Sequence, residues 1–409
     1  MIVCSIDLMK GRAVQLERGE KLVLERDDVI GLAERFGRIG EVAVIDLDAA
    51  LGQGENRALI ERLCRVARCR VGGGIRDVDQ ARAYLRAGAH AVIIGTAATP
   101  TFLRTLPRER TIVALDSRQN RVVTHGWRVT SGTSPLERVQ ELEPYCGGFL
   151  YTDVSREGIL QGHDMEFASS LRRATALPLT VAGGIRSTAE VVALDREGID
   201  AQVGMAIYTG TFDPADAFVA SIRLNADGLV PTIVCDNATG RPRMLAYSSA
   251  QSLGLALREG AGIYWSRSRR ELWKKGETSG HTQRLVRTEV DCDRDTVVFF
   301  VEQTGPTCHR GSQICFDYQK FSWDTLVARV ADRVETGAAD SYTARLALEP
   351  DLLNEKLREE ADEVARASTA TDVAWECADL LYFMTVKMQV AGVGIPDVMA
   401  QLAARAVGA

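Results

Sequence analysis

The sequence holds three groups of side chains whose types and spacing suit catalysis, and each group favours a different chemistry. In the first half, Asp7 and Asp116 each end an apolar, strand-like run. Thiols and carboxylates gather between residues 291 and 315, and closely spaced acids follow between residues 359 and 379. Paired carboxylates suit general acid and base catalysis, thiolates suit zinc, and clustered carboxylates suit magnesium.

An internal repeat surrounds the first group. Val71-Gly72-Gly73-Gly74-Ile75-Arg76 is similar to Val181-Ala182-Gly183-Gly184-Ile185-Arg186, about 110 residues later, and Asp7 and Asp116 are separated by nearly the same interval. Apolar strand-like runs alternate with helical runs throughout this half, which indicates a parallel sheet. Two copies of such a β/α unit predict a closed (β/α)8 barrel over residues 1–225.

The strand ends of this barrel are the expected place for a site. Active sites of such barrels lie at the C-terminal ends of the strands, so we expect Asp7 and Asp116 to face each other across the mouth. Gly73-Gly74 and Gly183-Gly184 allow backbone N–H groups to approach a phosphate, which predicts a substrate with a phosphate at each end. The alternative is that each pair only makes a tight strand-to-helix turn, but the symmetric repetition favours phosphate binding.

Residues 1–225 resemble the histidine-pathway isomerases that open the ribose of a phosphoribosyl-formimino aminoimidazole carboxamide nucleotide. The resemblance implies an Amadori rearrangement in which Asp116 protonates the ring oxygen and Asp7 removes the proton from C2. It also implies that Thr152 positions Asp116 or the substrate, and that Trp127 stacks on the imidazole. The predicted substrate-binding glycines are Gly73, Gly74, Gly183, Gly184 and Gly204. The matching stretches are Ser5-Ile6-Asp7-Leu8, Val71-Gly72-Gly73-Gly74-Ile75-Arg76, Ala114-Leu115-Asp116, Gly126-Trp127, Tyr151-Thr152-Asp153-Val154-Ser155-Arg156-Glu157-Gly158 and Ala182-Gly183-Gly184-Ile185.

Two features depart from the pattern of these isomerases. The segment from Leu16 to Asp28, expected as a loop, is a little short and lacks the usual pattern of polar residues, and Met205 follows Gly204 where a basic residue is usual. Two alternatives therefore stay open for the barrel. One is a catalytically silent scaffold, and the other is a barrel that also isomerises phosphoribosyl anthranilate.

The second group has the composition of a metal site. Asp291, Asp293 and Asp295 alternate with other residues, so on an extended strand they point to one face and suit Mg²⁺, while Cys292 points to the other face. Cys292, Cys308 and Cys315 match a catalytic zinc site, which has three protein ligands and one open position. His309 is the predicted proton carrier. The alternative, that each cysteine is a small buried residue, becomes weak for so many ligand types in 25 residues.

The region before this group suits nucleotide binding. Trp265 offers an aromatic face for a base, and Arg267, Lys275, Thr278 and Ser279 offer donors to phosphate. A charged hairpin with packed tryptophans is the alternative. Over residues 229–318, the Trp-Ser-Arg-Ser-Arg, Lys-Gly-Glu-Thr-Ser-Gly, Asp-Cys-Asp-x-Asp and Cys-His…Cys runs resemble phosphoribosyl-AMP cyclohydrolase. The resemblance implies opening of the adenine ring by zinc-activated water at C6, and a dimer because such zinc sites combine cysteines from two subunits.

The third group lies on predicted helices, Leu352 to Ala367 and Asp372 to Ala391. Carboxylates beside apolar core positions favour Mg²⁺, whereas a solvated acidic helix face is the alternative. The stretches around them resemble phosphoribosyl-ATP pyrophosphohydrolase, an all-helical magnesium-dependent hydrolase, over about 322–407. The predicted magnesium ligands here are Glu359, Glu360, Glu363, Glu376 and Asp379.

Composition fits a chain of several enzyme domains. The 409 residues, of which 46% are hydrophobic and 25% charged, exclude wholesale disorder, and no apolar run suits a membrane helix. A net charge of −6 argues against a nucleic-acid polymer as partner. No signal peptide is expected, which predicts a cytoplasmic location. The predicted domains are a barrel (1–225), a mixed α+β zinc domain (226–320) and an all-α domain (321–409).

The three resemblances together predict a trifunctional enzyme of histidine biosynthesis, acting as a homodimer with Zn²⁺ and Mg²⁺ on small phosphorylated nucleotides. It would release pyrophosphate from phosphoribosyl-ATP, open the adenine ring and isomerise the product. A bifunctional hydrolase with a silent barrel is the nearest alternative. A nucleotide-binding regulatory protein is another, although simple binding does not require the acids and thiolates.

Overall fold

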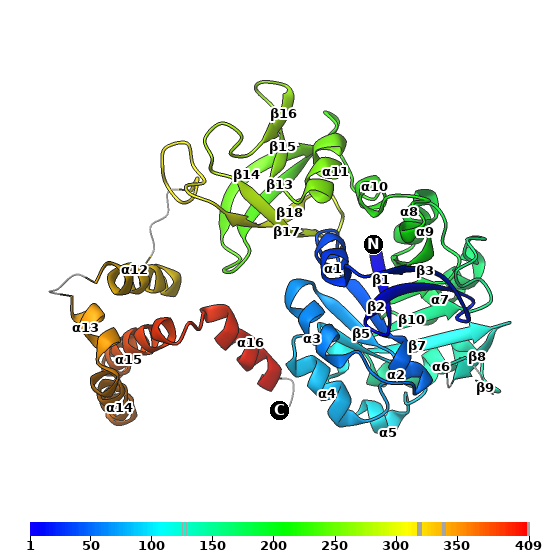
Figure 1. The fold of residues 1–409 in the computed structure, drawn as a ribbon, viewed down its shortest axis with the longest axis horizontal. Helices are drawn as coiled ribbons and strands as arrows, with labels where there is room; N and C mark the ends of the chain where they lie inside the picture. The colour runs from blue at the N-terminus through cyan, green and yellow to red at the C-terminus, as the bar shows by residue number, and fades with distance from the viewer. Residues whose placement is uncertain (125, 128, 317–320, 338–340, 407–409) are drawn as a thin grey trace. The chain divides into compact units, whose positions relative to one another are not determined.

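The computed structural model describes residues 1–409 apart from 125, 128, 317–320, 338–340 and 407–409, and the described chain forms two compact units (Figure 1). The first unit runs from Met1 to Cys315 and the second from Phe316 to Ala406. The predicted boundary at 225/226 falls inside the first unit, and residue 320 of the other boundary lies outside the described residues, so the three-domain division stays a prediction. None of the described helices combines the length and the apolar character that a membrane crossing requires.

The first part of unit 1 is a closed barrel of parallel strands, as predicted. The barrel closes because β1 pairs in parallel with β4 on one side and with β12 on the other. Asp7 on β1 and Asp116 on β7 lie on strands that are opposite each other in this order. The barrel strands in spatial order are β1 (Ile2–Met9), β4 (Val42–Asp46), β5 (Cys69–Gly72), β6 (Ala91–Ile94), β7 (Thr111–Arg118), β10 (Gly148–Asp153), β11 (Leu179–Ala182) and β12 (Ile199–Val203).

The strand sequences explain the barrel. Val42, Ala43 and Val44 are fully buried on both faces of β4, which is typical of parallel strands covered by helices. A small core inside the barrel contains Ile93, Leu150 and Ala182. The outer core packs the strands against helices, which are α1 (Val29–Gly37), α2 (Leu47–Leu51), α3 (Arg57–Val66), α4 (Val78–Arg86), α5 (Pro100–Leu103), α6 (Pro135–Leu142), α7 (Met165–Ala174), α8 (Thr188–Arg196), α9 (Met205–Tyr208) and α10 (Pro214–Ala220), with 3₁₀ turns at Arg108–Arg110 and Glu143–Tyr145.

The segment expected as a loop after the first strand is largely a β-hairpin, so that expectation was wrong. β2 (Arg12–Glu17) and β3 (Lys21–Arg26) are antiparallel, and β2 also pairs with β1, with Val14 opposite Asp7. Arg18 and Gly19 form the turn with positive φ angles of 54° and 74°. A second short hairpin, β8 (Arg121–Thr124) with β9 (Val129–Thr130), follows β7.

The second part of unit 1 is a mixed α+β fold. Its four-stranded sheet has the order β14-β13-β18-β17, in which only β13 and β18 are parallel. The helix of this part is α11 (Ala250–Glu259), with Ser249 as its N-cap. The sheet strands are β13 (Leu229–Asp236), β14 (Pro242–Ser249), β17 (Gln283–Val290) and β18 (Val297–Gln303), and β15 (Ile263–Ser266) pairs with β16 (Glu271–Lys274).

The mixed part shares one hydrophobic core with the barrel. Phe218 of α10 and Leu257 of α11 belong to the same buried cluster, and the two helices pack against each other. The buried Thr288 of β17 donates its hydroxyl to the carbonyl of Arg38, which follows α1. Arg258 of α11 pairs with Asp213, the N-cap of α10, at 2.8 Å. These contacts make the barrel and the mixed sheet one packed body.

Unit 2 is all-helical, as predicted. The predicted helices 352–367 and 372–391 correspond to α14 (Pro350–Arg366) and α15 (Ala370–Val390). Gly392, with a φ of +66°, follows α15 and allows the chain to turn into α16 (Ile395–Ala406). The remaining helices are α12 (Trp323–Thr336) and α13 (Tyr342–Leu348), and the core contains Val330, Leu346, Leu353, Phe383 and Val386.

Candidate active sites

A cavity of about 410 Å³ lies at the C-terminal ends of the barrel strands. Two of its carboxylates come from opposite strands, and the predicted phosphate-binding glycines come from the turns that follow β5, β11 and β12. The cavity therefore brings together all the site residues predicted for the barrel, which are Asp7, Asp116, Thr152, Trp127, Gly73, Gly74, Gly183, Gly184 and Gly204.

Asp7 has the environment of a base that works near neutral pH. Burial raises the pKa of Asp7 to about 6, and the hydroxyl of Ser5, which donates to its Oδ1 at 2.9 Å, lowers it in part. A carboxylate with this pKa is mostly ionised at pH 7 yet binds a proton more strongly than an exposed aspartate.

Asp116 is held by two neighbours that the sequence also singled out. The indole Nε1 of Trp127 donates to Asp116 Oδ2 at 2.8 Å, and Thr152 lies opposite Asp116 in the pairing of β10 with β7. Burial raises the pKa of Asp116, while the hydrogen bonds from Trp127 and Thr152 lower it. Trp127 itself has a φ of +67°, and its ring lies against Gly19 in the turn between β2 and β3.

Glu157 is a further cavity residue that was not assigned a role from the sequence. It lines the cavity, and burial, followed by the nearby Asp7, Asp116 and Asp153, raises its pKa to about 8. The backbone N–H of Arg18 donates to the Glu157 carbonyl at 3.0 Å, so the β2–β3 hairpin supports this loop. Glu157 lies in the matching stretch 151–158, but spacing alone gave no sign that this loop residue turns toward the two aspartates.

The repeated glycine turns have closely matching geometry. Gly73 and Gly183 have φ angles of +91° and +95°, and a Cβ on either would lie 2.3 or 2.5 Å from the carbonyl oxygen of Asp46 or Asp153, respectively. Only glycine fits such an approach. Each turn leads to the capped N-terminus of a nine-residue helix, α4 or α8, which favours an anion.

One turn has extra support from a buried histidine. His163 is 7% exposed, and its Nδ1 lies 3.1 Å from the carbonyl oxygen of Gly183. Burial lowers the pKa of His163, so the ring is neutral near pH 7 and donates through Nδ1 to this carbonyl. His163 therefore helps to hold the second glycine turn, at Gly183, in its conformation.

In the mixed part, two of the three predicted zinc cysteines lie together. Cys308 and Cys315 are within hydrogen-bonding reach of each other. Hydrogen bonds from the backbone N–H of Arg310 and from Ser312 lower the pKa of Cys308, while burial and the neighbouring Cys308 raise the pKa of Cys315. The exposed His309 has its Nδ1 4.0 Å from the Cys308 sulfur.

Cys292 does not join this thiol pair within one chain. It is exposed on the turn after β17, and the groups of three or more metal-ligating side chains among the described residues contain none of the three cysteines. One chain therefore places two of the predicted zinc ligands together and the third elsewhere.

Lys275, predicted to bind substrate, lies beside the thiol pair. Its side chain is 8% exposed, burial lowers its pKa, and both Cys315 and Cys308 interact with its charge. A cation at this place favours the thiolate forms that bind zinc. Of the other residues predicted to bind substrate, Trp265 and Arg267 line an open hollow in which the guanidinium stacks 3.9 Å from the Tyr247 ring. Thr278 and Ser279 lie on an exposed turn outside that hollow.

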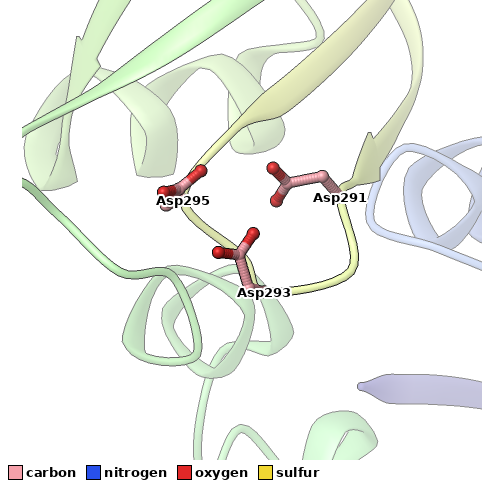
Figure 2. Close-up of side chains that lie close together, drawn as sticks. All are labelled: Asp291, Asp293 and Asp295. Carbon is pink, nitrogen blue, oxygen red and sulfur yellow. The ribbon is translucent and has the colours of Figure 1, made fainter.

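The three aspartates of the mixed part converge, although the reason expected for this was wrong. Asp291, Asp293 and Asp295 lie in the turn between β17 and β18, not on an extended strand. Their carboxylates point toward one another (Figure 2), with one oxygen from each within 4.8 Å of the others. Thr296 N–H donates to Asp291 Oδ1 at 3.1 Å and helps to close the turn. Three hard oxygen donors at this spacing fit a divalent cation.

In unit 2, the acids divide differently from the prediction. Glu360, Glu363 and Glu376 come together within 4.8 Å, whereas Glu359 is exposed and pairs with Lys356 at 2.6 Å. Glu360 is 8% exposed, and its Oε2 is buried without a hydrogen-bond partner. Burial and the nearby Glu363 and Asp379 raise the pKa of Glu360. A buried acceptor with no donor fits a bound cation.

Known families match this chain in three consecutive stretches. The sequence pattern described as "Histidine biosynthesis protein" matches residues 1–213, more than half of the chain. The chain belongs to the histidine biosynthesis protein family. The pattern of phosphoribosyl-AMP cyclohydrolase matches residues 244–317, and that of phosphoribosyl-ATP pyrophosphohydrolase matches residues 324–406. These stretches coincide with the barrel, the mixed part and the helical unit.

Curated relatives carry names from the same pathway. The histidine biosynthesis bifunctional protein HisIE of Staphylococcus aureus is 41% identical over 183 residues, which are 44% of this chain and 87% of that protein. A histidine biosynthesis trifunctional protein of Kluyveromyces lactis is 41% identical over 174 residues, and one of Komagataella pastoris is 39% identical over 221 residues. These matches cover 42% and 54% of this chain but only 22% and 25% of the trifunctional proteins.

Proposed function

We propose that the chain is a trifunctional enzyme that hydrolyses phosphoribosyl-ATP to phosphoribosyl-AMP, opens the adenine ring and isomerises the resulting aminoaldose to the aminoketose. The observation that carries this proposal is that each family match contains its own cluster of chemically suited side chains. The chain covers only about a quarter or less of the trifunctional relatives, so their printed names support the pathway and not the set of activities.

The barrel cavity supports the isomerisation. An Amadori rearrangement requires a proton on the ring oxygen and removal of the C2 proton, and the proposed substrate also has a phosphate at each end to be held. Asp7, with a pKa of about 6, suits the base that takes the C2 proton. Glu157, with a pKa of about 8, carries a proton at neutral pH, and it can share with Asp116 the donation to the ring oxygen. The turns at Gly73 and Gly183 would hold the two phosphates.

The mixed part supports ring opening. Cys308 and Cys315 of one copy and Cys292 of a second copy would hold a zinc ion, and Lys275 would stabilise the thiolates. Zinc bound there would make water nucleophilic near neutral pH. His309 is placed to carry a proton to or from the reacting adenine ring. Asp291, Asp293 and Asp295 fit a magnesium ion.

A homodimer follows from this arrangement, because a single chain does not bring the three cysteines together. The helical unit has features that suit oligomerisation as well. Along α15, Trp375 is 69% exposed and Leu381 is 39% exposed. We infer that a second copy of this chain covers these side chains, since the zinc ligands already require one.

The helical unit supports pyrophosphate release. Glu360, Glu363 and Glu376, with Asp379 beside them, would hold a magnesium ion, and the unpartnered Oε2 of Glu360 is the observation that favours this over a solvated acidic face. Bound magnesium would neutralise charge on the triphosphate. The cytoplasmic location stays a prediction.

Single substitutions test whether the three sites work independently. With each step assayed on its own substrate, Asp116→Asn should stop only isomerisation, Cys308→Ser only ring opening and Glu363→Gln only pyrophosphate release. Loss of all three activities in each variant would overturn the assignment of one reaction to each site.

A further inference from the structure

Arg294 links the barrel to the turn of the mixed part that carries Asp291, Asp293 and Asp295. It lies between Asp293 and Asp295, and its side chain leaves the turn to form an ion pair with Asp195 of α8, 2.6 Å from NH1 to Oδ1. The backbone of the same residue is held too, because Arg223 N–H donates to the Arg294 carbonyl at 2.8 Å. Asp195 and Arg223 both lie outside the turn, so contacts with other segments of the chain hold the turn in place.

The backbone conformation of Arg294 is unusual and needs such outside contacts to hold it. Its φ is +66°, in the left-handed region, which is unfavourable for a residue with a Cβ. Within the turn itself, Thr296 N–H donates to Asp291 Oδ1 and Asp291 N–H donates to the Thr296 carbonyl at 3.2 Å. These bonds close the ends of the turn, and the Arg294 N–H also donates to the Asp291 carboxylate, whereas the side chain and the carbonyl of Arg294 are held from outside.

The ion pair also decides where the positive charge of Arg294 lies. Although two aspartates flank it in the sequence, no ion pair within the described part of the chain reaches Asp291, Asp293 or Asp295. The side chain of Asp195 is only 6% exposed and that of Arg294 is 21% exposed, so their charges attract each other more strongly than at an open surface. The ion pair therefore directs the guanidinium toward the barrel and away from the three acids of the turn.

We propose that Arg294 is a positioning residue for the divalent-cation site of the mixed part. Its ion pair with Asp195 holds the turn in the conformation in which the three carboxylates converge, and it keeps the guanidinium out of the place of the cation. The barrel is then a structural part of the ring-opening site, in addition to carrying its own site. This inference rests on the proposed magnesium site of the cyclohydrolase part.

The test is the affinity of the full-length protein for Mn²⁺, used as the probe for the divalent cation and measured by calorimetry or electron paramagnetic resonance. Glu363→Gln is introduced in every sample to weaken the site of the helical unit. We expect Asp195→Asn and Arg294→Met to raise the Kd for Mn²⁺ about 10- to 100-fold, as for other residues that orient metal ligands. Arg294→Lys, which keeps the charge opposite Asp195, should recover part of the affinity.

Asp216→Asn is the matched control, because Asp216 also joins the barrel to the mixed part, through Arg258, but does not contact the turn. This variant should bind Mn²⁺ like the parent. Equal weakening by Asp216→Asn would assign the effect to the whole junction and overturn the role of Arg294. Unchanged affinity in Asp195→Asn and Arg294→Met would also overturn it.

Failure of the underlying site gives a different result. If Asp293→Asn leaves Mn²⁺ binding unchanged, the turn does not bind the cation, and both the proposed magnesium site and the role of Arg294 are wrong. Isomerisation in the barrel, assayed on the same samples, checks folding. Asp195 lies in α8, outside the residues that line the barrel cavity, so this activity should stay at the parent level.

Discussion

At the scale of single residues, the barrel cavity separates the proton affinities of three carboxyl groups. Ser5 donates to Asp7, whose pKa is about 6, and Trp127 donates to Asp116. Glu157 is buried near both aspartates and has a pKa of about 8. Environments that push the pKa values of neighbouring acids apart assign one of them as base and another as acid. Here they favour Asp7 as the base and Glu157 as a proton donor.

This separation predicts a bell-shaped pH profile for isomerisation. The value of kcat/KM should rise with pH through about 6, as Asp7 loses its proton, and fall above about 8, as Glu157 loses its own. Glu157→Gln should lower kcat/KM about 10²-fold or more and remove the alkaline limb. The exposed Glu166→Gln is the control and should change neither limb. An alkaline limb that persists in Glu157→Gln would exclude Glu157 as its source.

Two adjacent glutamates in the helical unit allow a second residue-level prediction. Glu360 is buried with an unpartnered Oε2, whereas Glu359 is exposed and paired with Lys356. We expect Glu360→Gln to lower pyrophosphate release about 100-fold or more, because it removes charge from the magnesium site. Glu359→Gln should retain activity within about threefold, since an exposed ion pair contributes little. Steady-state rates with excess Mg²⁺ measure both, and the reverse ranking would refute the ligand set.

At the scale of elements, the internal repeat was more informative about the fold than the local order of apolar and polar residues. Gly73 and Gly183 marked the two halves of the barrel because a close backbone approach leaves only one residue type possible. The β2–β3 hairpin was missed because β3 is almost wholly exposed, so its residues do not show the alternation of apolar and polar side chains that marks a half-buried strand. Asp291, Asp293 and Asp295 were grouped correctly by spacing, but the sequence did not show that a turn, not a strand, brings them together.

The orientation of neighbouring side chains on a helix also could not be predicted from the sequence. Glu359 and Glu360 are adjacent, and both were predicted as magnesium ligands, whereas the packing of α14 against α15 turns only Glu360 inward, toward Glu363 and Glu376. Which of two adjacent acids faces the core depends on how the helix is rotated against its partner. The sequence around one glutamate does not reveal how the helix is rotated.

The glycine turns give an element-level prediction. Gly183→Ala places a Cβ 2.5 Å from the Asp153 carbonyl oxygen, so the turn must shift and the phosphate cradle with it. We expect KM for the isomerase substrate to rise at least about tenfold and Tm to fall. Gly198→Ala is the control, because its φ of +71° is also strained but nothing lies within 4 Å of the added Cβ. It should lower Tm slightly at unchanged KM, and an unchanged KM in Gly183→Ala would argue against phosphate binding at this turn.

At the scale of the whole molecule, the three family matches do not correspond to three separate bodies. The barrel and the mixed part form one unit with a shared core, while the helical unit is compact by itself. The order of the matches along the chain is the reverse of the proposed order of reactions, for which we have no physical account. Cys292 lies apart from Cys308 and Cys315 in one chain, and the proposed zinc site therefore draws on a second copy.

Subunit complementation tests this second copy. Cys292→Ser and Cys308→Ser should each abolish ring opening, because each removes a zinc ligand from every site. Co-expression of the two variants should restore about a quarter of the parent activity, since random pairing makes half of the dimers mixed and each mixed dimer has one intact site of two. No recovery, with mixed dimers shown to be present, would place all three cysteines in one chain.

The most direct test of the trifunctional account is the fate of phosphoribosyl-ATP given to the purified protein with Mg²⁺ and Zn²⁺. Products are separated chromatographically against standards, because the last step is an isomerisation that leaves mass unchanged. The account predicts accumulation of the aminoketose, with phosphoribosyl-AMP and the ring-opened aldose as transient species. A reaction that stops at the ring-opened aldose would contradict it and leave a bifunctional hydrolase with a silent barrel.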